Sequence, residues 1–385
     1  MAALNVSFVL VVLGAILWGF LIIRWAFDAN IVGFDFEGTL WDPAVEIRQG
    51  RSPYPAPVTA EVDVGNPALY PPLLMLIVAP LTVLPWWLGV SLWTVLLAAA
   101  AASTLYILNV RDVRCYVVAL VSMPVVVGLA FGNATLLLVP LIACAWRWRK
   151  RWVLTGVLVG LAVASKLFLW PLLVWLLATR RYRSFAVALA SVAAGVLGPW
   201  ALIGFDGITT YPDLLQLAEE IYATHGYSVA TIFSALGADP HVAGRGALGI
   251  GVGIAAVAFY AGRQRADSTS LSLAVLAAII GSPIVWPFYH ALLLVPIAIA
   301  RPRFSGLWVG VLLFYFANEL PRDTLRASDM LPGGAACCRP DEFPAALWAF
   351  NHSPPGLWPA AGFTAVAIGL VAVSFVTMRR VRTAL

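Results

Sequence analysis

The stretch WVLTGVLVGLAVASKLFLWPLLVWLLAT, residues 152–179, contains a single charged side chain, Lys166. Basic residues flank it on both sides, at Arg151 and Arg180. In lipid a helix satisfies its own backbone hydrogen bonds, and about 20 apolar residues span the hydrocarbon core. Because both ends lie beside basic residues, which mark cytoplasmic loops, we expect a hairpin that leaves and returns to the same side. Lys166 then lies at the far, outer end of this hairpin.

Composition extends this interpretation to the whole chain. Of its 385 residues, 61% are hydrophobic and 11% are charged, and the mean hydropathy is +0.89. A soluble fold of this length needs far less apolar surface, so the sequence predicts an all-α integral membrane protein. The apolar run at 6–27 lacks a charged n-region and a small-residue cleavage site, and we expect it to be a retained first span.

Charge is distributed unevenly along the chain. Three polar segments, 28–70, 205–226 and 318–355, hold 16 of the 19 acidic residues and 5 basic ones, and we expect them to be outer loops. Short basic clusters hold 16 of the 24 Lys and Arg and predict cytoplasmic loops. These clusters are Arg111/Arg114, Arg147/Arg149/Lys150/Arg151, Arg180/Arg181/Arg183, Arg263/Arg265, Arg301/Arg303 and Arg379/Arg380/Arg382. This pattern explains the net charge of +5 without a nucleic-acid partner.

With the sides assigned, the runs 115–131 and 133–147 form an outward and a returning pass, and Gly132-Asn133 is their outer turn. The segment 71–110 is too long for one span, and Pro80 and Pro85 are expected to break it. Either a half-span precedes a full span there, or Arg111 and Arg114 lie on the other side. The sequence predicts about 10 to 13 spans, by the length criterion for each. No repeat divides them, so we expect a single transmembrane domain over residues 1–385.

Three titratable residues are candidates for chemistry. Asp35 follows the first apolar run within Gly33-Phe34-Asp35-Phe36-Glu37 and is either a general base toward a sugar hydroxyl or an interfacial acid or helix cap. Lys166 needs a compensating partner, either an outer phosphate ester or the surface that it reaches by snorkelling. His290 follows Trp286-Pro287-Phe288-Tyr289 and is either a phosphate or proton contact or a packing residue.

The cysteines and acids give no positive signal for a metal or a disulfide framework. Cys115 and Cys144 lie in apolar runs, while Cys337 and Cys338 are adjacent in an outer loop. We therefore predict no cofactor and no metal site. A divalent metal site is the alternative, with Asp35, Glu37 and His290 as its ligands.

Several short motifs together resemble a known family. They are Asp35-Phe36, Gly50-Arg51-Ser52-Pro53-Tyr54, Tyr70-Pro71-Pro72-Leu73, Ala79-Pro80-Leu81, Leu84-Pro85, Gly132-Asn133, the helix with Lys166, and Ser282-Pro283 through Tyr289-His290. With them the chain resembles the polyprenol-phosphate-dependent glycosyltransferases of the GT-C fold, most closely glycosyltransferase family 87. The resemblance implies a multi-spanning helical bundle with its active site in extracytoplasmic loops of a plasma membrane, and a bacterial source.

The resemblance also implies an activity and roles for residues. The expected reaction is inverting transfer of a sugar, commonly mannose, from a polyprenyl-phosphate donor to a lipid-linked or glycan acceptor. Asp35 would be the general base, and Lys166 and His290 would meet the donor phosphate. Further donor or acceptor contacts are expected at Glu37, Tyr54, Tyr70, Asn133 and Tyr289. The alternative function is a transporter or flippase of a polyprenyl-linked or amphipathic substrate, with Lys166 as a cation in a broken helix.

Overall fold

The computed structural model describes residue 9, residues 12–17 and 19–24, and then 32–54, 68–222, 226–317 and 356–383. Within these ranges the chain is helical and contains no strand. The predicted all-α fold is therefore confirmed. The outer loop 318–355, with Cys337 and Cys338, lies outside the described residues, whereas Cys115 and Cys144 are free thiols.

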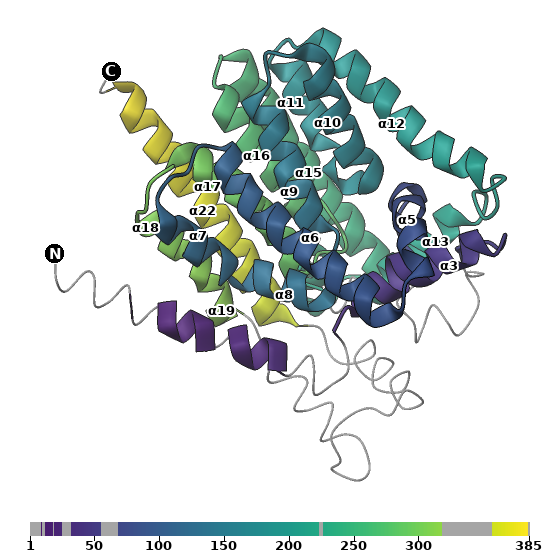
Figure 1. Cartoon of the computed structure of the whole chain (residues 1–385). Helices are drawn as coiled ribbons and strands as arrows, with labels where there is room; N and C mark the ends of the chain where they lie inside the picture. Colours follow the sequence, from purple (N-terminus) through teal and green to yellow (C-terminus); the bar gives the residue numbers. More distant parts are fainter. Residues whose placement is uncertain are drawn as a thin grey trace.

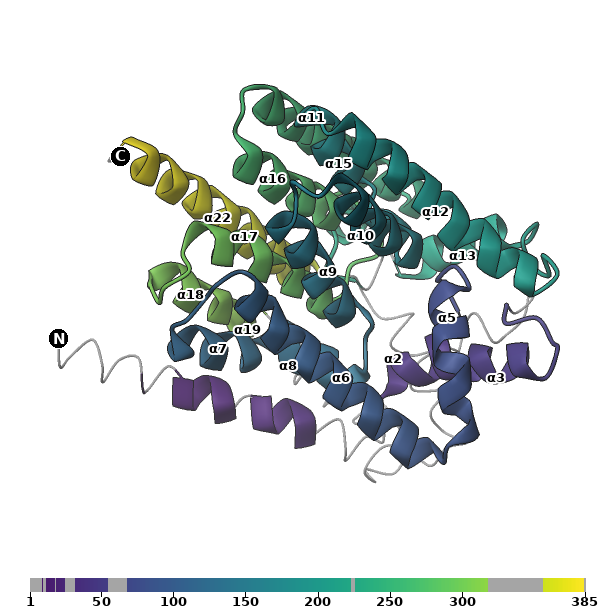
Figure 2. The ribbon, with the colours of Figure 1, turned by 45° about the horizontal axis from the view of Figure 1, so that its top comes forward.

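The first outer loop forms a helical segment at one edge of the bundle (Figures 1 and 2). A continuous helical segment from the first outer loop comprises α2 (Phe34–Phe36), the π-helical η1 (Glu37–Trp41) and α3 (Asp42–Arg48). It packs against α5 (Leu73–Val78) and α8 (Met123–Phe131). The remaining elements of this half are η2 (Ala79–Val83), α6 (Trp86–Ile107), α7 (Val113–Leu120) and α9 (Thr135–Arg147).

The second half of the chain continues the helical bundle. Its first elements are α10 (Trp152–Ser165), η3 (Leu167–Leu169), α11 (Pro171–Ala178), α12 (Tyr182–Leu202), α13 (Tyr211–Tyr222) and α14 (Val229–Ala235). They are followed by α15 (Pro240–Arg263), α16 (Asp267–Ile280), η4 (Pro287–Leu293), α17 (Leu294–Ala300), α18 (Gly306–Gly310), η5 (Val311–Leu313), α19 (Phe314–Ala317) and α22 (Leu357–Thr383). The element η4 packs against both α8 and α9.

Among the described residues, four helices are long and apolar enough to cross a membrane: α6, α12, α15 and α22. The pair α7 and α8, bent by 54°, makes a fifth if it counts as one span. The other apolar helices have 10–17 residues, shorter than a full crossing. The number of 10 to 13 spans therefore stays a prediction.

The proline-rich segment after Tyr70 divides in two. The short helices α5 and η2 come first, with Pro80 in the first turn of η2. Pro85 is the N-cap of α6, and α6 then continues for 22 residues. This arrangement is the half-length piece before a full span that the sequence left as one of two alternatives.

The predicted cytoplasmic loops meet at one end of the molecule. Asp267 pairs with Arg149 at 3.2 Å and with Arg181 at 2.7 Å, which joins three of the loops. Asp112 pairs with Arg114 at 2.8 Å and accepts a hydrogen bond from the Phe304 amide at 3.1 Å. The hydrogen bonds from Arg114 lower the pKa of Asp112 to about 2, so its carboxylate stays ionised. The loop with Arg111 and Arg114 thus lies with the other basic loops.

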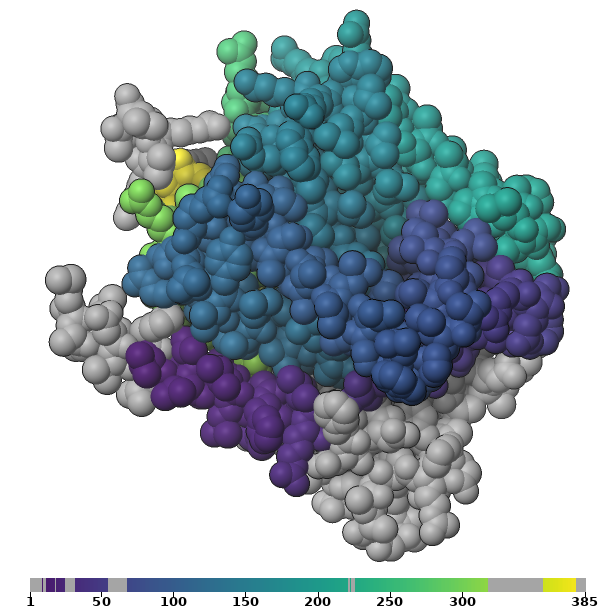
Figure 3. All heavy atoms as spheres, in the orientation of Figure 1, coloured from purple at the N-terminus to yellow at the C-terminus, as the bar shows by residue number. Residues whose placement is uncertain are grey.

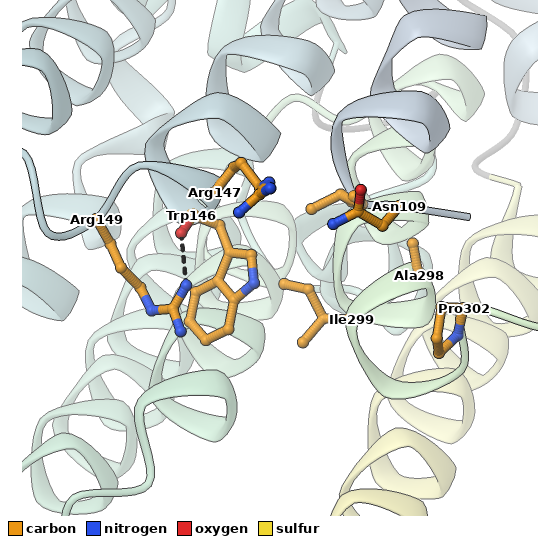
Figure 4. Close-up of a pocket in the computed structure, with 8 residues that line it drawn as sticks. Asn109, Trp146, Arg147, Arg149, Ala298, Ile299 and Pro302 are labelled. Atoms are coloured by element: carbon orange, nitrogen blue, oxygen red, sulfur yellow. Dashed lines mark hydrogen bonds between the residues drawn. The ribbon is translucent and has the colours of Figure 1, made fainter. Parts of the chain in front are cut away.

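A pocket of about 270 Å³ lies at this basic end (Figure 4). Its lining comes from the chain around the C-terminal ends of α6, α9 and α17 and includes Asn109, Arg147, Arg149 and Pro302. Figure 4 shows the Arg149 guanidinium donating to the Trp146 carbonyl oxygen, at 2.9 Å. The pocket therefore links the loop after α6 to the loops that follow α9 and α17.

Candidate functional site

The position of Asp35 depends on an unusual backbone conformation at the residue that precedes the first outer helix. Gly33 adopts φ +77°, and its amide donates to the Ala130 carbonyl at 2.8 Å. A Cβ at Gly33 would lie 2.7 Å from a Val90 methyl group, so a larger residue does not fit. The helical segment then begins at Phe34, and its first turn leaves the Asp35 side chain half-buried. The acid therefore has a fixed backbone position beside the end of α8.

The Gly132-Asn133 turn brings the second group of the site to the same place. Gly132 caps α8 with φ +73°, and a Cβ there would lie 2.8 Å from the Phe36 Cβ. The Trp93 indole donates to the Gly132 carbonyl at 2.7 Å and stacks on Phe36 at 4.7 Å between ring centroids. The turn and the first outer helix are thus in direct contact, and Asn133 is fully buried between them.

The Asn133 amide joins the candidate acid to the candidate cation. Its Nδ2 donates to Asp35 Oδ2 at 2.5 Å and makes a longer contact of 3.3 Å with the Tyr70 hydroxyl. Its Oδ1 accepts from the Thr135 amide at 2.8 Å and from Lys166 Nζ at 3.1 Å. Residues distant in sequence by up to 131 positions, from Asp35 to Lys166, therefore form one polar cluster.

Lys166 lies between α10 and η3, in the middle of the predicted hairpin. The helix α10 ends at Ser165, and Lys166 itself has the extended dihedrals φ −144° and ψ 105°. Its side chain is 2% exposed, and Nζ donates to the Tyr70 hydroxyl and the Thr135 hydroxyl, each at 2.9 Å. The ammonium also lies 4.4 Å from the Tyr70 ring centre and 4.5 Å from that of Tyr289. Hydroxyls, an amide and two aromatic faces thus compensate a buried cation, and snorkelling is not its state.

Aromatic residues complete the walls of the site. The Tyr289 ring stacks on Phe168 with centroids 4.8 Å apart and an angle of 2°. The Tyr54 hydroxyl donates to the Tyr70 carbonyl at 2.8 Å, and its ring stacks on Trp200 at 4.8 Å. Burial raises the pKa of the Tyr54 phenol, so this hydroxyl remains a donor. The Tyr54 hydroxyl therefore helps to hold the backbone of Tyr70 in place. Figure 3 shows the segment that precedes the first grey gap after α3 packed against the chain that follows α12.

Of the described residues, His290 and Glu37 are not among those that hydrogen-bond within this cluster. His290 is 2% exposed; its Nδ1 is 3.2 Å from the Pro287 carbonyl oxygen, and its ring lies 5.0 Å from Phe314 and from Phe363. These contacts fit the packing alternative, and its donor-phosphate role stays a prediction. Glu37 is exposed on η1. The structure thus brings together Asp35, Asn133, Lys166, Tyr70 and Tyr289.

Sequence reasoning missed Thr135, which contacts both Asn133 and Lys166. Its signal was the pattern Asn133-Ala134-Thr135 at the start of an apolar helix, because an Asn side chain there accepts the amide hydrogen bond two residues later. Tyr222 was missed as well; it is buried on α13 and lies within electrostatic range of Asp35. No local signal in the sequence places α13 over the site.

No group of three or more His, Cys, Asp or Glu side chains in the described part of the chain comes together to hold a metal ion. The site instead consists of one carboxylate, one ammonium, one amide and several hydroxyls. Such a set can accept a proton, neutralise developing negative charge and hydrogen-bond a sugar.

The fold and this site define a class: a helical membrane protein with a carboxylate and a buried cation joined at one end of the bundle. The sequence pattern of glycosyltransferase family 87 matches residues 68–287, more than half of the chain. The chain belongs to glycosyltransferase family 87 and is a membrane glycosyltransferase. No curated protein matches it. The matched region contains Tyr70, Asn133, Thr135 and Lys166, whereas Asp35, Tyr289 and His290 lie outside it.

Proposed function

We propose that the protein is an inverting glycosyltransferase that moves mannose from a polyprenyl-phosphate donor to a lipid or glycan acceptor, with Asp35 as general base. The observation that carries the proposal is the contact of the Asp35 carboxylate with Asn133, beside Lys166, in a member of a glycosyltransferase family. A half-buried carboxylate can meet an acceptor hydroxyl from outside while its other neighbours hold it in place.

The proposed reaction is a single displacement at the anomeric carbon. As the acceptor oxygen attacks, its proton passes to the Asp35 carboxylate, and a bond forms between that oxygen and the anomeric carbon. The bond between the anomeric carbon and the phosphate oxygen breaks, and the polyprenyl phosphate leaves with the electron pair. One displacement inverts the anomeric configuration, and a phosphate ester leaves without needing a protein acid.

The place of the site in the bundle suits a lipid-linked donor. The helix α9 has 13 residues, so about 20 Å separates the Asn133 cluster from the basic loop at Arg147. If the basic loops are cytoplasmic, the site lies near the opposite surface of the membrane. A polyprenyl chain can then remain among the helices while its phosphate and sugar reach the aqueous boundary. We therefore place the reaction on the extracytoplasmic face.

The first experiment measures transfer of radiolabelled mannose from polyprenyl-phosphate mannose to extracted lipid acceptors by purified protein. We expect Asp35→Asn to lower the rate by about 100-fold or more, since a positioned general base contributes about that much. The matched control is Asp213→Asn, an exposed acid on α13, which should retain wild-type transfer. Equal rates for wild type and Asp35→Asn would remove Asp35 from the mechanism.

Family membership favours an enzyme over the transporter. The same proteins, reconstituted in proteoliposomes, decide between them independently. Uptake of a polyprenyl-linked substrate that survives Asp35→Asn, without sugar transfer, would reverse this ranking.

A further inference from the structure

The orientation of the Asn133 amide is fixed by its neighbours. Two donors, the Thr135 amide and Lys166 Nζ, face Oδ1, which can only accept hydrogen bonds. Rotation of the amide by 180° would place its NH₂ group against these two donors. The Nδ2 group is therefore directed at Asp35, where it donates at 2.5 Å. Lys166 thus influences the acid through the amide as well as through space.

The donors of Lys166 are already used. An ammonium has three N–H groups, and Lys166 Nζ has three oxygen partners at 2.9–3.1 Å: the Tyr70 hydroxyl, the Thr135 hydroxyl and Asn133 Oδ1. The faces of the Tyr70 and Tyr289 rings occupy two further directions. A donor phosphate would have to displace one of these partners to reach Nζ. Direct phosphate binding is therefore not the role that this geometry favours.

Resting on the proposed function of Asp35, we propose that Lys166 and Asn133 are positioning residues: Lys166 locks the Asn133 amide, and this amide holds the Asp35 carboxylate ionised and oriented as the base. Among the described residues, the other groups that interact electrostatically with Asp35 include Tyr70, Tyr222 and Tyr289. These phenols are neutral at physiological pH, and the Asn133 amide is a hydrogen-bond donor that meets the carboxylate itself. A hydrogen bond donated to the carboxylate favours its ionised form, and the contact of Lys166 with Oδ1 keeps the amide in the orientation that donates.

The first test reads Asp35 directly and needs no enzymatic activity. Infrared spectroscopy follows the stretching band of the protonated carboxyl group across a pH titration, and the band is assigned by its loss in Asp35→Asn. We expect the midpoint of Asp35 to rise by about 1 to 2 pH units in Asn133→Ala and in Lys166→Met, because each removes a group that favours the anion. The double variant should shift by less than the sum of the two, since the residues act as a unit.

The matched control is Lys150→Met, which removes the only other lysine of the chain, at the basic end. It should leave the midpoint of Asp35 unchanged. Asn133→Ala leaves Lys166 with both hydroxyl partners, and its shift decides the matter if Lys166→Met does not fold. An unshifted midpoint in Asn133→Ala, or additive shifts in the double variant, would overturn the proposal.

The second test uses kinetics with polyprenyl-phosphate mannose as the varied substrate. For both variants we expect kcat at neutral pH to fall about 10- to 100-fold, as for a misplaced catalytic group, while the donor KM stays within about threefold. The acidic limb of the pH–rate profile should move to higher pH. A raised KM with normal kcat and an unshifted limb in Lys166→Met would identify Lys166 as a phosphate contact instead.

The two tests separate the possible failures. If wild-type protein transfers no sugar but the infrared midpoint moves as expected, the positioning network stands and the proposed function fails. If transfer depends on Asp35 but the midpoint does not move, the proposed function stands and the network fails.

Discussion

At the scale of single residues, the site depends on backbone conformations that are unusual for residues with a side chain. Gly33 and Gly132 both have positive φ, and each lies where a Cβ would meet a neighbouring side chain at less than 3 Å. Gly132 lets the turn contact Phe36, which is next to Asp35. The contact between Asp35 and Asn133 therefore depends on glycine at a position that takes no part in chemistry.

We expect Gly132→Ala to destabilise the protein by about 2 kcal/mol, because it adds left-handed strain and a clash with Phe36. Transfer activity should fall with it. Thermal unfolding in detergent, followed by tryptophan fluorescence, measures the change. The control is Gly249→Ala on α15, where nothing lies within 4 Å of the added Cβ and helix propensity favours alanine. Equal stability of Gly132→Ala and wild type would contradict this account.

At the scale of elements, the position of Lys166 is set by how α10 packs. Gly156 and Gly160 lie one turn apart on α10, and α12 approaches both closely. A Cβ at Gly160 would lie 2.4 Å from the Ser191 Cβ and 2.7 Å from the Ala188 carbonyl oxygen. Small residues at this spacing let two helices in lipid approach at backbone distance. The end of α10, and Lys166 with it, is thereby held against the rest of the bundle.

Gly160→Val should therefore push α10 and α12 apart. We expect a loss of about 1 to 3 kcal/mol in stability, as for other overpacked interfaces, together with reduced transfer because Lys166 moves. Gly198→Ala provides the comparison on α12, since its added Cβ meets nothing within 4 Å. A wild-type unfolding midpoint for Gly160→Val would show that the two helices can separate freely.

At the scale of the whole molecule, the charged groups are segregated to two ends. Arg149, Arg181 and Asp267 join three loops at one end, and the Asn133 cluster lies at the other end of α9. The positive-inside rule predicts that the two ends lie on opposite sides of the membrane. The positive potential of the basic end therefore lies away from the Asn133 cluster.

This orientation predicts opposite labelling of the two ends. In a background with the four native cysteines replaced by serine, Lys150→Cys should react with a membrane-impermeant thiol reagent only from the cytoplasmic side. Asp213→Cys, exposed on α13, should react only from outside. Intact cells and inverted vesicles provide the two measurements. Labelling of both positions from the same side would refute the orientation.

Part of this was predictable from the sequence. Apolar runs of membrane-spanning length determined the helical class, and the basic clusters identified the loops that share an end, because both signals are local and follow from the cost of burying polar groups in lipid. Asp35 and Lys166 were recognisable for the same reason, as charged residues in apolar surroundings. The break at Pro80 and Pro85 follows from the missing amide of proline.

Only the tertiary structure decided what these residues contact. Asn133 lies 98 positions after Asp35 and 33 before Lys166, and no local pattern encodes that its amide faces both. The same holds for His290, whose environment of Phe314 and Phe363 arises where η4 meets α19 and α22. Burial and hydrogen-bond geometry depend on how distant helices pack, and a single sequence specifies that packing only through the sum of many weak contacts. The sequence by itself determined which residues are costly in a membrane, and the fold decided which partners compensate them.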